Sequence, residues 1–481
     1  MSVKKNFLYN VLYQILIIII PLITTPYIAR VIGPKGVGIQ SYTFSVASYF
    51  VLFAMLGLNN YGSRTIAAVR DDKTELSKNF LSIYTLQLIM SILVIVAYTI
   101  YLKFFVTKYK IFFLIQLIYI VAAIFDINWF FFGIEKFKLT VTRNSIIKII
   151  TVISIFIFVR DSGDLYIYSI ILALSTLISQ LILWNFVNKY INFEKISVKE
   201  VVVHFKPNLV LFIPVIAISM YRMMDKIMIG KMSSITQVGF FSNSEKIIAI
   251  PLGIIAALGT VMIPKMSNLK ARGDINNSKR YISLSIEIII FIAMGAAFGL
   301  IAISPVLIPV FLDKEFIDCV PIVSLLAITI VFISWANVIR TQFLIPNKMD
   351  KIYIISTILG AMVNLISNLI LIRRYGAIGA TIGTILAECV VCIYQSIKVR
   401  RELEIIIYLK KCIFYIIPGF IMYIVVSFIG KNLGVSILTG LIQIVIGGFL
   451  YLFISILYMY KNKNEILLNI IDNILRKINR S

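Results

Sequence analysis

Charged and metal-binding side chains are scarce in this sequence. Only 14% of the 481 residues are charged and the chain has one histidine, His204, whereas about 25% of the residues of an average soluble domain are charged. The four cysteines lie in or beside apolar segments, where small buried thiols behave as ordinary apolar residues. Cys389 and Cys392 have the spacing of half a zinc site, but no second pair accompanies them. We therefore expect no metal site and no cofactor.

A nucleotide-binding motif is also missing. The segment YIARVIGPKGVGIQSY, residues 27–42, contains a cluster of three glycines beside a lysine. Gly33 and Gly38 have the glycine spacing of a Walker A loop, but Ile39 and Gln40 stand where Lys and Ser/Thr would bind phosphate and magnesium. The glycines instead predict a tight turn between two membrane spans at the outer surface.

Long apolar runs are abundant. Sixty per cent of the residues are hydrophobic, and many fall in runs of about 20, enough helix to cross ~30 Å of hydrocarbon. The sequence therefore predicts an all-α polytopic membrane protein with about 14 transmembrane helices. They are expected at 8–32, 40–62, 81–102, 111–133, 146–160, 165–188, 208–230, 239–264, 282–303, 319–345, 353–372, 376–397, 411–429 and 436–460.

The basic residues are distributed asymmetrically between the two ends of these spans. With both termini in the cytoplasm, the inner loops, tails and adjoining span ends hold 31 Lys and Arg, and the outer ones hold ten. The positive-inside rule therefore favours this orientation. It also accounts for the net charge of +24, which in a soluble chain would suggest a nucleic-acid partner. The first apolar run is of span length and lacks a small-residue cleavage site, so we expect a helix rather than a signal peptide.

An inner loop at residues 188–208 separates the first twelve spans into two sets of six. A weak internal repeat agrees with this division: RVIGPKGVGIQSY resembles IMIGKMSSITQVGFFS, with Gly38 aligned to Gly239 and Ser41 to Ser242. Gly33 aligns with Gly230 if a four-residue insertion is allowed. We expect an N-terminal lobe at 1–200, a C-terminal lobe at 201–400, and two additional helices with a basic tail at 401–481.

Two further segments have simple interpretations. The tail from residue 461 to 481 places its apolar residues on one helical face and Lys and Arg around the other, which predicts a helix on the inner membrane surface. The acids of Asp71-Asp72-Lys-Thr-Glu75 resemble a magnesium site, but Asp72 is better explained as a helix N-cap.

Ionisable residues inside the spans are the candidates for function, because each costs about 2.5–3.5 kcal/mol at the bilayer centre. Arg222, Asp225 and Lys226 are spaced i, i+3 and i+4, which places them on one face of a helix. Several cations at membrane depth suit an anionic headgroup, and a diphosphate requires more than one. The cations are Arg30, Arg222, Lys226, Lys246 and Arg340, and the acids are Asp126, Asp225, Glu245 and Glu388, with Glu287 near a span end.

Simpler explanations exist for some of these residues. Arg30, close to the turn, and Arg340, near an inner span end, are equally well explained as side chains that extend toward the headgroups. Arg222, Asp225 and Lys226 lie deeper, so a polar cavity is favoured for them. The acids either bind a coupling proton or sodium ion or hold the cations in place.

Four segments resemble the Wzx-type flippases in the polysaccharide branch of the multidrug/oligosaccharidyl-lipid/polysaccharide exporter superfamily. They are Ala29–Gly38, Met55–Ala67, Asp225–Ser242 and Arg374–Thr384. The resemblance implies two six-helix lobes related by a pseudo-two-fold axis around a central cavity. It also implies transport of undecaprenyl-pyrophosphate-linked oligosaccharide repeat units to the outer leaflet of the bacterial cytoplasmic membrane, by alternating access driven by an ion gradient.

The resemblance also gives roles to individual residues. Arg30, Arg64, Arg222 and Lys226 become candidates for the diphosphate path. As charges within spans, Lys246 and Arg340 are further candidates for that path, and Asp126, Asp225, Glu245 and Glu388 are candidates for coupling to H⁺ or Na⁺. The implied partners are the lipid-linked oligosaccharide, membrane lipids and a polysaccharide polymerase or export machinery.

Three alternatives remain open. The thirteenth and fourteenth spans resemble those of lipid II flippases, so lipid II is an alternative cargo. A drug/cation antiporter of the same fold should have a cavity dominated by acids, whereas the outer-half candidates here are four cations and two acids. An enzyme acting on the same lipid should carry a long outer loop, and no outer connection expected here is long enough to form a domain.

Overall fold

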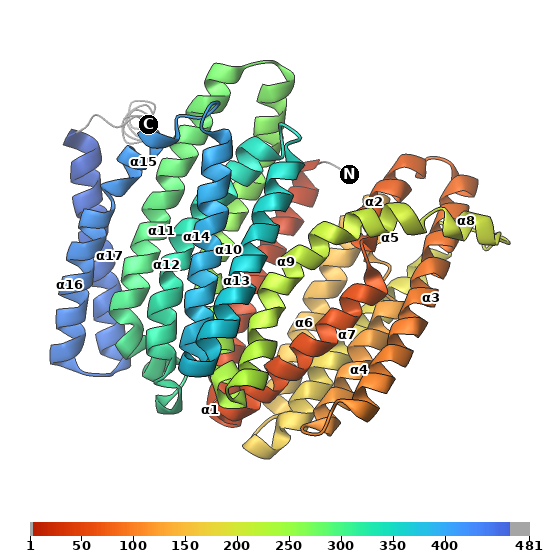
Figure 1. Cartoon of the computed structure of the whole chain (residues 1–481), viewed down its shortest axis with the longest axis horizontal. Helices are drawn as coiled ribbons and strands as arrows, with labels where there is room; N and C mark the ends of the chain where they lie inside the picture. Colours follow the sequence, from red (N-terminus) through yellow and green to blue (C-terminus); the bar gives the residue numbers. More distant parts are fainter. Residues whose placement is uncertain (1–2, 462–481) are drawn as a thin grey trace, which may run out of the picture. The chain divides into compact units, whose positions relative to one another are not determined.

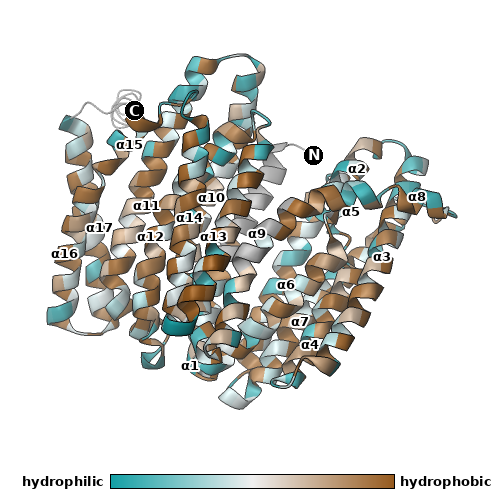
Figure 2. Ribbon diagram, viewed as in Figure 1, coloured by the Kyte–Doolittle hydropathy of each residue, from teal (hydrophilic) through white to brown (hydrophobic). Residues whose placement is uncertain are grey.

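The computed structural model describes residues 3–461, apart from the side chains of 3–15, 17, 18, 214, 217, 218 and 220–222. This part of the chain consists of helices and their connections and contains no β-strand (Figure 1). Twelve of its helical stretches are long and apolar enough to cross a membrane, and hydrophobic residues run along them (Figure 2). The predicted all-α membrane fold is confirmed. The interfacial helix predicted for the tail lies outside the described residues.

The chain divides into two compact units, Met1–Ser242 with Ile372–Ala377, and Asn243–Leu371 with Ile378–Ser481. The lobe boundaries expected at residues 200 and 400 stay a prediction. The first unit contains α1 (Val3–Met55), α2 (Leu58–Val69), α3 (Lys73–Phe104), α4 (Lys110–Ile124), α5 (Asn128–Gly133), α6 (Phe137–Phe158), η1 (Ser162–Asp164), α7 (Leu165–Val187), α8 (Val198–Val202) and α9 (Phe205–Met232).

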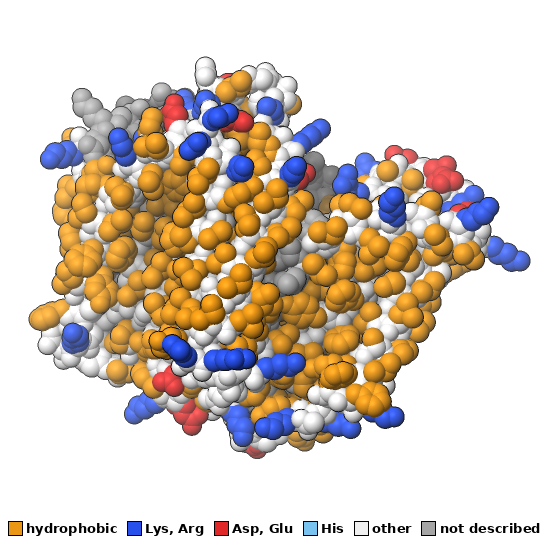
Figure 3. All heavy atoms as spheres, viewed as in Figure 1, with side chains coloured by type: hydrophobic (Ala, Val, Ile, Leu, Met, Phe, Trp, Pro, Cys, Tyr) orange, Lys and Arg blue, Asp and Glu red, His pale blue; other side chains and the backbone are white. Residues whose placement is uncertain are grey.

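The second unit contains most of α10 (Ile235–Ala271) and of α13 (Asp350–Tyr375), and nearly all of α14 (Ala377–Val399). Its other elements are α11 (Ile275–Phe311), η2 (Lys314–Phe316), α12 (Cys319–Val338), η3 (Ile339–Leu344), α15 (Ile405–Ile413), α16 (Ile416–Leu433) and α17 (Ile437–Lys461). Figure 3 shows hydrophobic side chains over the middle of each unit's visible face and Lys and Arg side chains toward its edges, the distribution expected of a membrane protein.

The turn expected between the first two spans is a break of one residue. Gly33 has φ 71° and ψ 174° inside α1, a backbone conformation that favours glycine. Helix resumes at Pro34, where the missing N–H costs little because it lies in a first turn. The expectation that the whole glycine cluster forms a loop is therefore wrong, since Gly36 and Gly38 are helical.

Several helix boundaries differ from the expected ones. The helix expected at 146–160 begins nine residues earlier, at Phe137. The second expected span ends at Met55 rather than residue 62, because Leu56 has a positive φ of 47° and α2 starts at Leu58. Among the twelve membrane-length stretches, Ile19–Val69 contains the break at Gly33 and so covers the first two expected spans. The helix α9 falls on the seventh.

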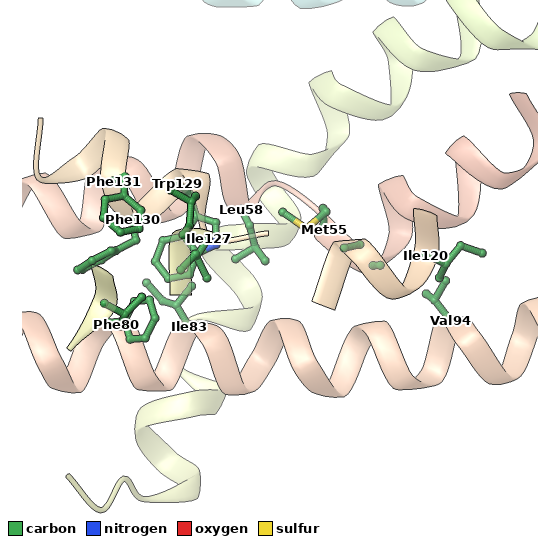
Figure 4. Close-up of a cluster of buried hydrophobic side chains, with 14 of the residues drawn as sticks. Met55, Leu58, Phe80, Ile83, Val94, Ile120, Ile127, Trp129, Phe130 and Phe131 are labelled. Carbon is green, nitrogen blue, oxygen red and sulfur yellow. The ribbon is translucent and has the colours of Figure 1, made fainter. Parts of the chain in front are cut away.

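Aromatic residues fill the core of the first unit. Trp129, Phe130 and Phe131 of α5 are fully buried beside Phe80 of α3 (Figure 4). The Trp129 indole Nε1 donates a hydrogen bond to Gln87 Oε1 at 2.9 Å.

At the start of α3, the Asp72 carboxylate accepts hydrogen bonds from the N–H groups of residues 74 and 75 at 2.9 and 3.1 Å. The predicted N-cap is confirmed.

The C-terminal helices pack on α11 in the second unit. Helices α15, α16 and α17 each contact α11, and a small apolar cluster forms around Met422 and Tyr451. The Tyr451 hydroxyl donates to the Phe291 carbonyl at 2.6 Å, and the Tyr415 hydroxyl donates to buried Glu287 at 3.2 Å. Glu287, near the end of the ninth expected span, therefore bonds the additional helices to α11.

Candidate functional site

The two glycine segments of the sequence repeat pack against each other in the first unit. A Cβ added at Gly38 would lie 1.9 Å from the Ile235 carbonyl oxygen, and a Cβ added at Gly239 would lie 1.9 Å from the Pro34 carbonyl oxygen. Each glycine thus meets the residue four positions before the other glycine. The contact is reciprocal, as expected of two copies of one motif related by a two-fold axis.

The same symmetry includes the aligned serines. The Ser41 hydroxyl donates a hydrogen bond to Ser242 Oγ at 2.8 Å. Both the glycine pair and the serine pair are 201 residues apart, so the repeat continues without a gap. The alignment of Gly33 with Gly230, which requires a four-residue insertion before this pair, stays a prediction.

Helix α9 carries the deepest candidate charges. Asp225 is buried, Lys226 is half-buried, and Arg222 lies three residues before Asp225 on the same helix. Helices α9 and α1 contact each other, and the Asp225 carboxylate acts electrostatically on Tyr49 of α1. The structure therefore places Asp225 near the part of α1 that follows the Gly33 break, whereas Arg30 precedes that break.

The exposed face of α1 combines apolar residues with one cation. Arg30 is exposed, whereas its neighbours Ile28 and Ala29 are buried. Ile19 and Ile23 are 46% and 50% exposed, and their spacings of eleven and seven residues from Arg30 place all three on one helical face. Farther along the chain, Arg64 is exposed on α2. The exposed face of α1 is therefore apolar at Ile19 and Ile23 and basic at Arg30.

Asp126 occupies a separate site at the break between α4 and α5. Its Oδ1 accepts hydrogen bonds from Asn128 N at 3.1 Å and from Asn128 Nδ2 at 2.7 Å. The carboxylate lines a cavity of about 120 Å³ whose polar lining also includes Ser48, Thr176 and Gln180. The rest of the lining consists of Phe44, Val51, Tyr119, Ala122 and Ala123, so partners for water are present only on the side formed by the polar residues.

Arg143 makes several hydrogen bonds beside this cavity, and the sequence analysis missed it. It is 6% exposed on α6 and donates to Asn128 Oδ1 at 2.9 Å and to Gln180 Oε1 at 3.3 Å. It also donates to the Ser179 carbonyl at 2.6 Å. Its position just before the expected fifth span made it appear to be a loop cation. The earlier start of α6 would have revealed it.

The remaining candidates belong to the second unit and lie on different helices. Lys246 Nζ of α10 donates to Asn243 Oδ1 at 3.2 Å, and its neighbour Glu245 is half-buried. Arg340 lies in the π-helical turn η3, 5.4 Å from the centroid of the Tyr353 ring. Glu388 of α14 is only 9% exposed. Their roles in binding and coupling stay predictions.

Buried amides form a second feature that the search for ionisable residues passed over. Asn364 and Asn368, one turn apart on α13, are fully buried, and Asn368 Nδ2 donates to Asn364 Oδ1 at 3.1 Å. On α14, Gln395 Nε2 donates to Ser356 Oγ of α13 at 2.9 Å. The signal in the sequence is a polar residue every four positions in an apolar span.

A family model matches more than half of the chain, and two relatives match most of it. The model described as "Polysaccharide biosynthesis protein" matches residues 3–270. The "Putative O-antigen transporter" of Escherichia coli (strain K12) is 24% identical over 410 residues, which cover 84% of this chain and 98% of that protein. The protein of the same name from Shigella dysenteriae is 25% identical over 403 residues, covering 82% of this chain and 100% of that protein.

Solved structures of transporters share the fold. The lipid II flippase MurJ in an inward closed conformation superposes with a TM-score of 0.77 at 17% identity, covering 95% of this chain and 99% of that one. An inward-facing multidrug resistance MATE family transporter of the MOP superfamily gives a TM-score of 0.55 at 14% identity, covering 80% and 98%. At these identities the likeness concerns the arrangement of helices.

Proposed function

The chain belongs to the family of polysaccharide biosynthesis proteins, and from this premise we propose that it is a flippase for undecaprenyl-pyrophosphate-linked oligosaccharide repeat units. It moves them from the cytoplasmic to the outer leaflet of a bacterial cytoplasmic membrane for the synthesis of capsule or another surface polysaccharide. The resemblance carried by the four sequence segments is confirmed at the level of the family and superfamily. The relatives are transporters, and this chain is a transporter rather than an enzyme.

The amphiphilic face of α1 is the observation that carries this proposal. A polyprenyl diphosphate has a long apolar chain joined to two adjacent phosphates. Ile19 and Ile23 supply exposed apolar surface, and Arg30 supplies a guanidinium seven residues beyond Ile23. Guanidinium groups bind phosphate oxygens through paired hydrogen bonds. The order of groups along α1 therefore matches the order of groups along the lipid.

Helix α9 supplies further charge for the headgroup. A diphosphate carries more charge than one cation neutralises, and α9, which contacts α1, carries Arg222 and Lys226. Arg64 on α2 is proposed to contact the headgroup at the inner end of the path. Lys246 and Arg340 of the second unit are proposed as later contacts.

Transport is proposed to proceed by alternating access coupled to a proton or sodium gradient. Asp126, which lines a small cavity, and buried Asp225 are proposed as the acids of the first unit that exchange such an ion. Glu245 and Glu388 are candidates in the second unit. Arg143 is linked to Asp126 through Asn128, which donates to Asp126 Oδ1 and accepts from Arg143.

Deletion of the gene in its native host tests the cargo. The deletion strain is expected to accumulate undecaprenyl-linked oligosaccharide in the inner leaflet, measured by leaflet-resolved chemical labelling and mass spectrometry of lipid extracts. Unchanged exposure of this lipid at the outer face would contradict the proposal. Rescue of a strain depleted of its lipid II flippase, with no change in the oligosaccharide lipid, would reassign the cargo to lipid II.

Charge-removal variants test the path. Arg30→Ala and the double variant Arg222→Ala/Lys226→Ala are expected to abolish complementation at normal membrane abundance, whereas Arg30→Lys retains part of it. Lys35→Ala is the matched control, because Lys35 is exposed five residues from Arg30 on the other side of the Gly33 break. Full activity of the first two variants would show that the cations lie off the path.

A further inference from the structure

A basic cavity lies where α10 and α11 are joined, within the second unit. It has a volume of about 390 Å³ and is lined by Lys265, Asn268, Leu269, Arg272, Asn277 and Tyr281. Figure 1 shows this connection at the same end of the unit as the end of α17, the side predicted to face the cytoplasm. None of these residues belongs to the proposed transport path.

The charge around this cavity is strongly positive. The stretch from residue 265 to 280 contains five Lys and Arg and a single acid, Asp274. That acid caps α11: its Oδ1 accepts from Asn277 N at 3.2 Å and its Oδ2 from Asn277 Nδ2 at 2.7 Å. The cavity therefore offers two lining cations, Lys265 and Arg272, beside a carboxylate already engaged by the start of α11.

Lys265 is held in place by an aromatic ring. Its Nζ donates to the Tyr281 hydroxyl at 2.8 Å and lies 4.0 Å from the centroid of the same ring. Both contacts join α10 to α11 across the cavity. A lysine fixed in this way presents its remaining N–H donors in a defined direction, at a smaller entropic cost than a free surface lysine.

The depth of the cavity is given by the residues that precede it. Val261, one helical turn before Lys265, is 51% exposed and belongs to the apolar surface of α10 with Ile254 and Leu258. One turn of helix rises 5.4 Å, so Lys265 lies just beyond this apolar surface, and Arg272 follows two turns later. Tyrosine is enriched at this level of a membrane. The cavity is therefore at the depth of phospholipid headgroups.

We propose that this cavity binds the headgroup of an anionic phospholipid of the surrounding membrane. Lys265 and Arg272 contact the phosphate, and the amides of Asn268 and Asn277 contact the polar substituent. Basic pockets at the cytoplasmic side of membrane helices have the charge and position that select such lipids. The bound lipid joins the ends of α10 and α11 and so stabilises the second unit.

Lipid titration of the full-length protein in mild detergent tests this site. Phosphatidylglycerol is added to the wild type and to Lys265→Ala/Arg272→Ala, and bound lipid is counted by native mass spectrometry. We expect the double substitution to weaken binding by about tenfold to thirtyfold, since each basic residue near an anionic surface contributes on the order of 1 kcal/mol. Phosphatidylglycerol should also raise the thermal midpoint of the wild type more than that of the variant.

The control removes equal charge on the same side of the same unit. Lys398→Ala/Arg400→Ala alters two exposed cations, one of which also lies over a tyrosine, at 5.5 Å from the Tyr394 centroid. This variant should bind lipid as the wild type does, and Lys265→Arg/Arg272→Lys should retain most binding. Equal loss in the control, or equal binding of phosphatidylcholine, would overturn the proposal.

Two probes distinguish the source of the phosphate. Inorganic phosphate at millimolar concentration should leave bound phosphatidylglycerol in place. Undecaprenyl diphosphate should not displace it at equal concentration. Displacement by inorganic phosphate would identify a site for a soluble anion, and displacement by undecaprenyl diphosphate would identify a site for the cargo. Either result overturns the assignment to a membrane phospholipid.

Discussion

Gly38 and Gly239 illustrate, at the scale of single residues, how a weak sequence repeat becomes a close contact. Neither glycine has an unusual backbone conformation, since both lie in helices. They are required because each allows the main chain of the other copy to approach within 1.9 Å of the position that a Cβ would occupy. The requirement at these two positions comes from tertiary approach, whereas the turn predicted for the segment is made by Gly33.

Substitution of either glycine by alanine should destabilise the protein. The added methyl group meets backbone carbonyl oxygens that cannot move aside, so we expect Gly38→Ala and Gly239→Ala each to cost about 1–3 kcal/mol. The thermal midpoint of the purified protein, measured by scanning fluorimetry, should fall for both. Because the two contacts share one interface, the double variant should lose less than the sum of the single losses.

Gly448→Ala is the matched control for these variants. Gly448 is a helical glycine of α17 with nothing within 4 Å of an added Cβ, and alanine favours helix over glycine. Its midpoint should stay the same or rise. A midpoint for Gly38→Ala equal to that of the control would refute the close approach of the two repeats.

Arg143 shows what single-residue reasoning from sequence leaves out. Hydropathy singles out charges inside apolar runs, and this arginine falls three residues before the expected start at 146. Its acceptors, Asn128 and Gln180, are neutral and come from two other helices. A hydropathy pattern contains no information about which distant amides meet a given cation.

At the scale of elements, the lengths of the spans followed from hydropathy, but the ends of the helices did not. Helix α6 begins at Phe137, and its first turns carry Lys138 and Arg143. Helix continues through these polar turns because backbone hydrogen bonds do not require an apolar environment, whereas the hydropathy signal stops at the hydrocarbon edge. The same reasoning explains why α10 and α11, at 37 residues each, exceed the ~20 residues needed to cross.

The connection between α8 and α9 contains a pH-sensitive contact with α2. His204 is 6% exposed, and its Nδ1 lies 2.6 Å from the Tyr61 hydroxyl. Burial lowers the pKa of His204. When Nδ1 carries no hydrogen, the imidazole accepts a hydrogen bond from the tyrosine, and protonation turns Nδ1 into a donor. Protonation of His204 therefore changes the hydrogen bonding at the junction of these elements and places a charge in a buried position.

Acidification should weaken this junction. The unfolded chain takes up the proton first, so the contribution to stability is complete above the unfolded pKa of about 6.5 and is lost as the pH falls through the lower folded pKa. We expect the thermal midpoint of the wild type to drop between pH 7.5 and 5.0 by more than that of His204→Asn, whose amide oxygen replaces Nδ1 as acceptor. Parallel pH profiles for the two proteins would contradict this assignment.

At the scale of the whole molecule, the sequence leads to an orientation as well as a fold. The count of 31 basic residues inside and ten outside rests on about fourteen crossings and inner termini. The helices of the described residues agree with this number of crossings. The stretch Ile19–Val69 covers two expected spans, α9 coincides with the seventh, and the other membrane-length stretches account for the rest. The side of the membrane on which each connection lies is predicted only by the distribution of Lys and Arg.

Single cysteines in exposed connections test this orientation. In a variant with the four native cysteines replaced, Lys108→Cys and Lys431→Cys should react with a membrane-impermeant maleimide in intact spheroplasts. Lys195→Cys and Arg400→Cys should react only after permeabilisation, because an odd number of expected spans separates each of them from the connection containing Lys108. All four positions are exposed. If all four cysteines show the opposite labelling, the protein has the inverse orientation. If only Lys431→Cys does, α16 does not cross the membrane. With α17 still crossing, the number of spans is then odd and the two termini lie on opposite sides.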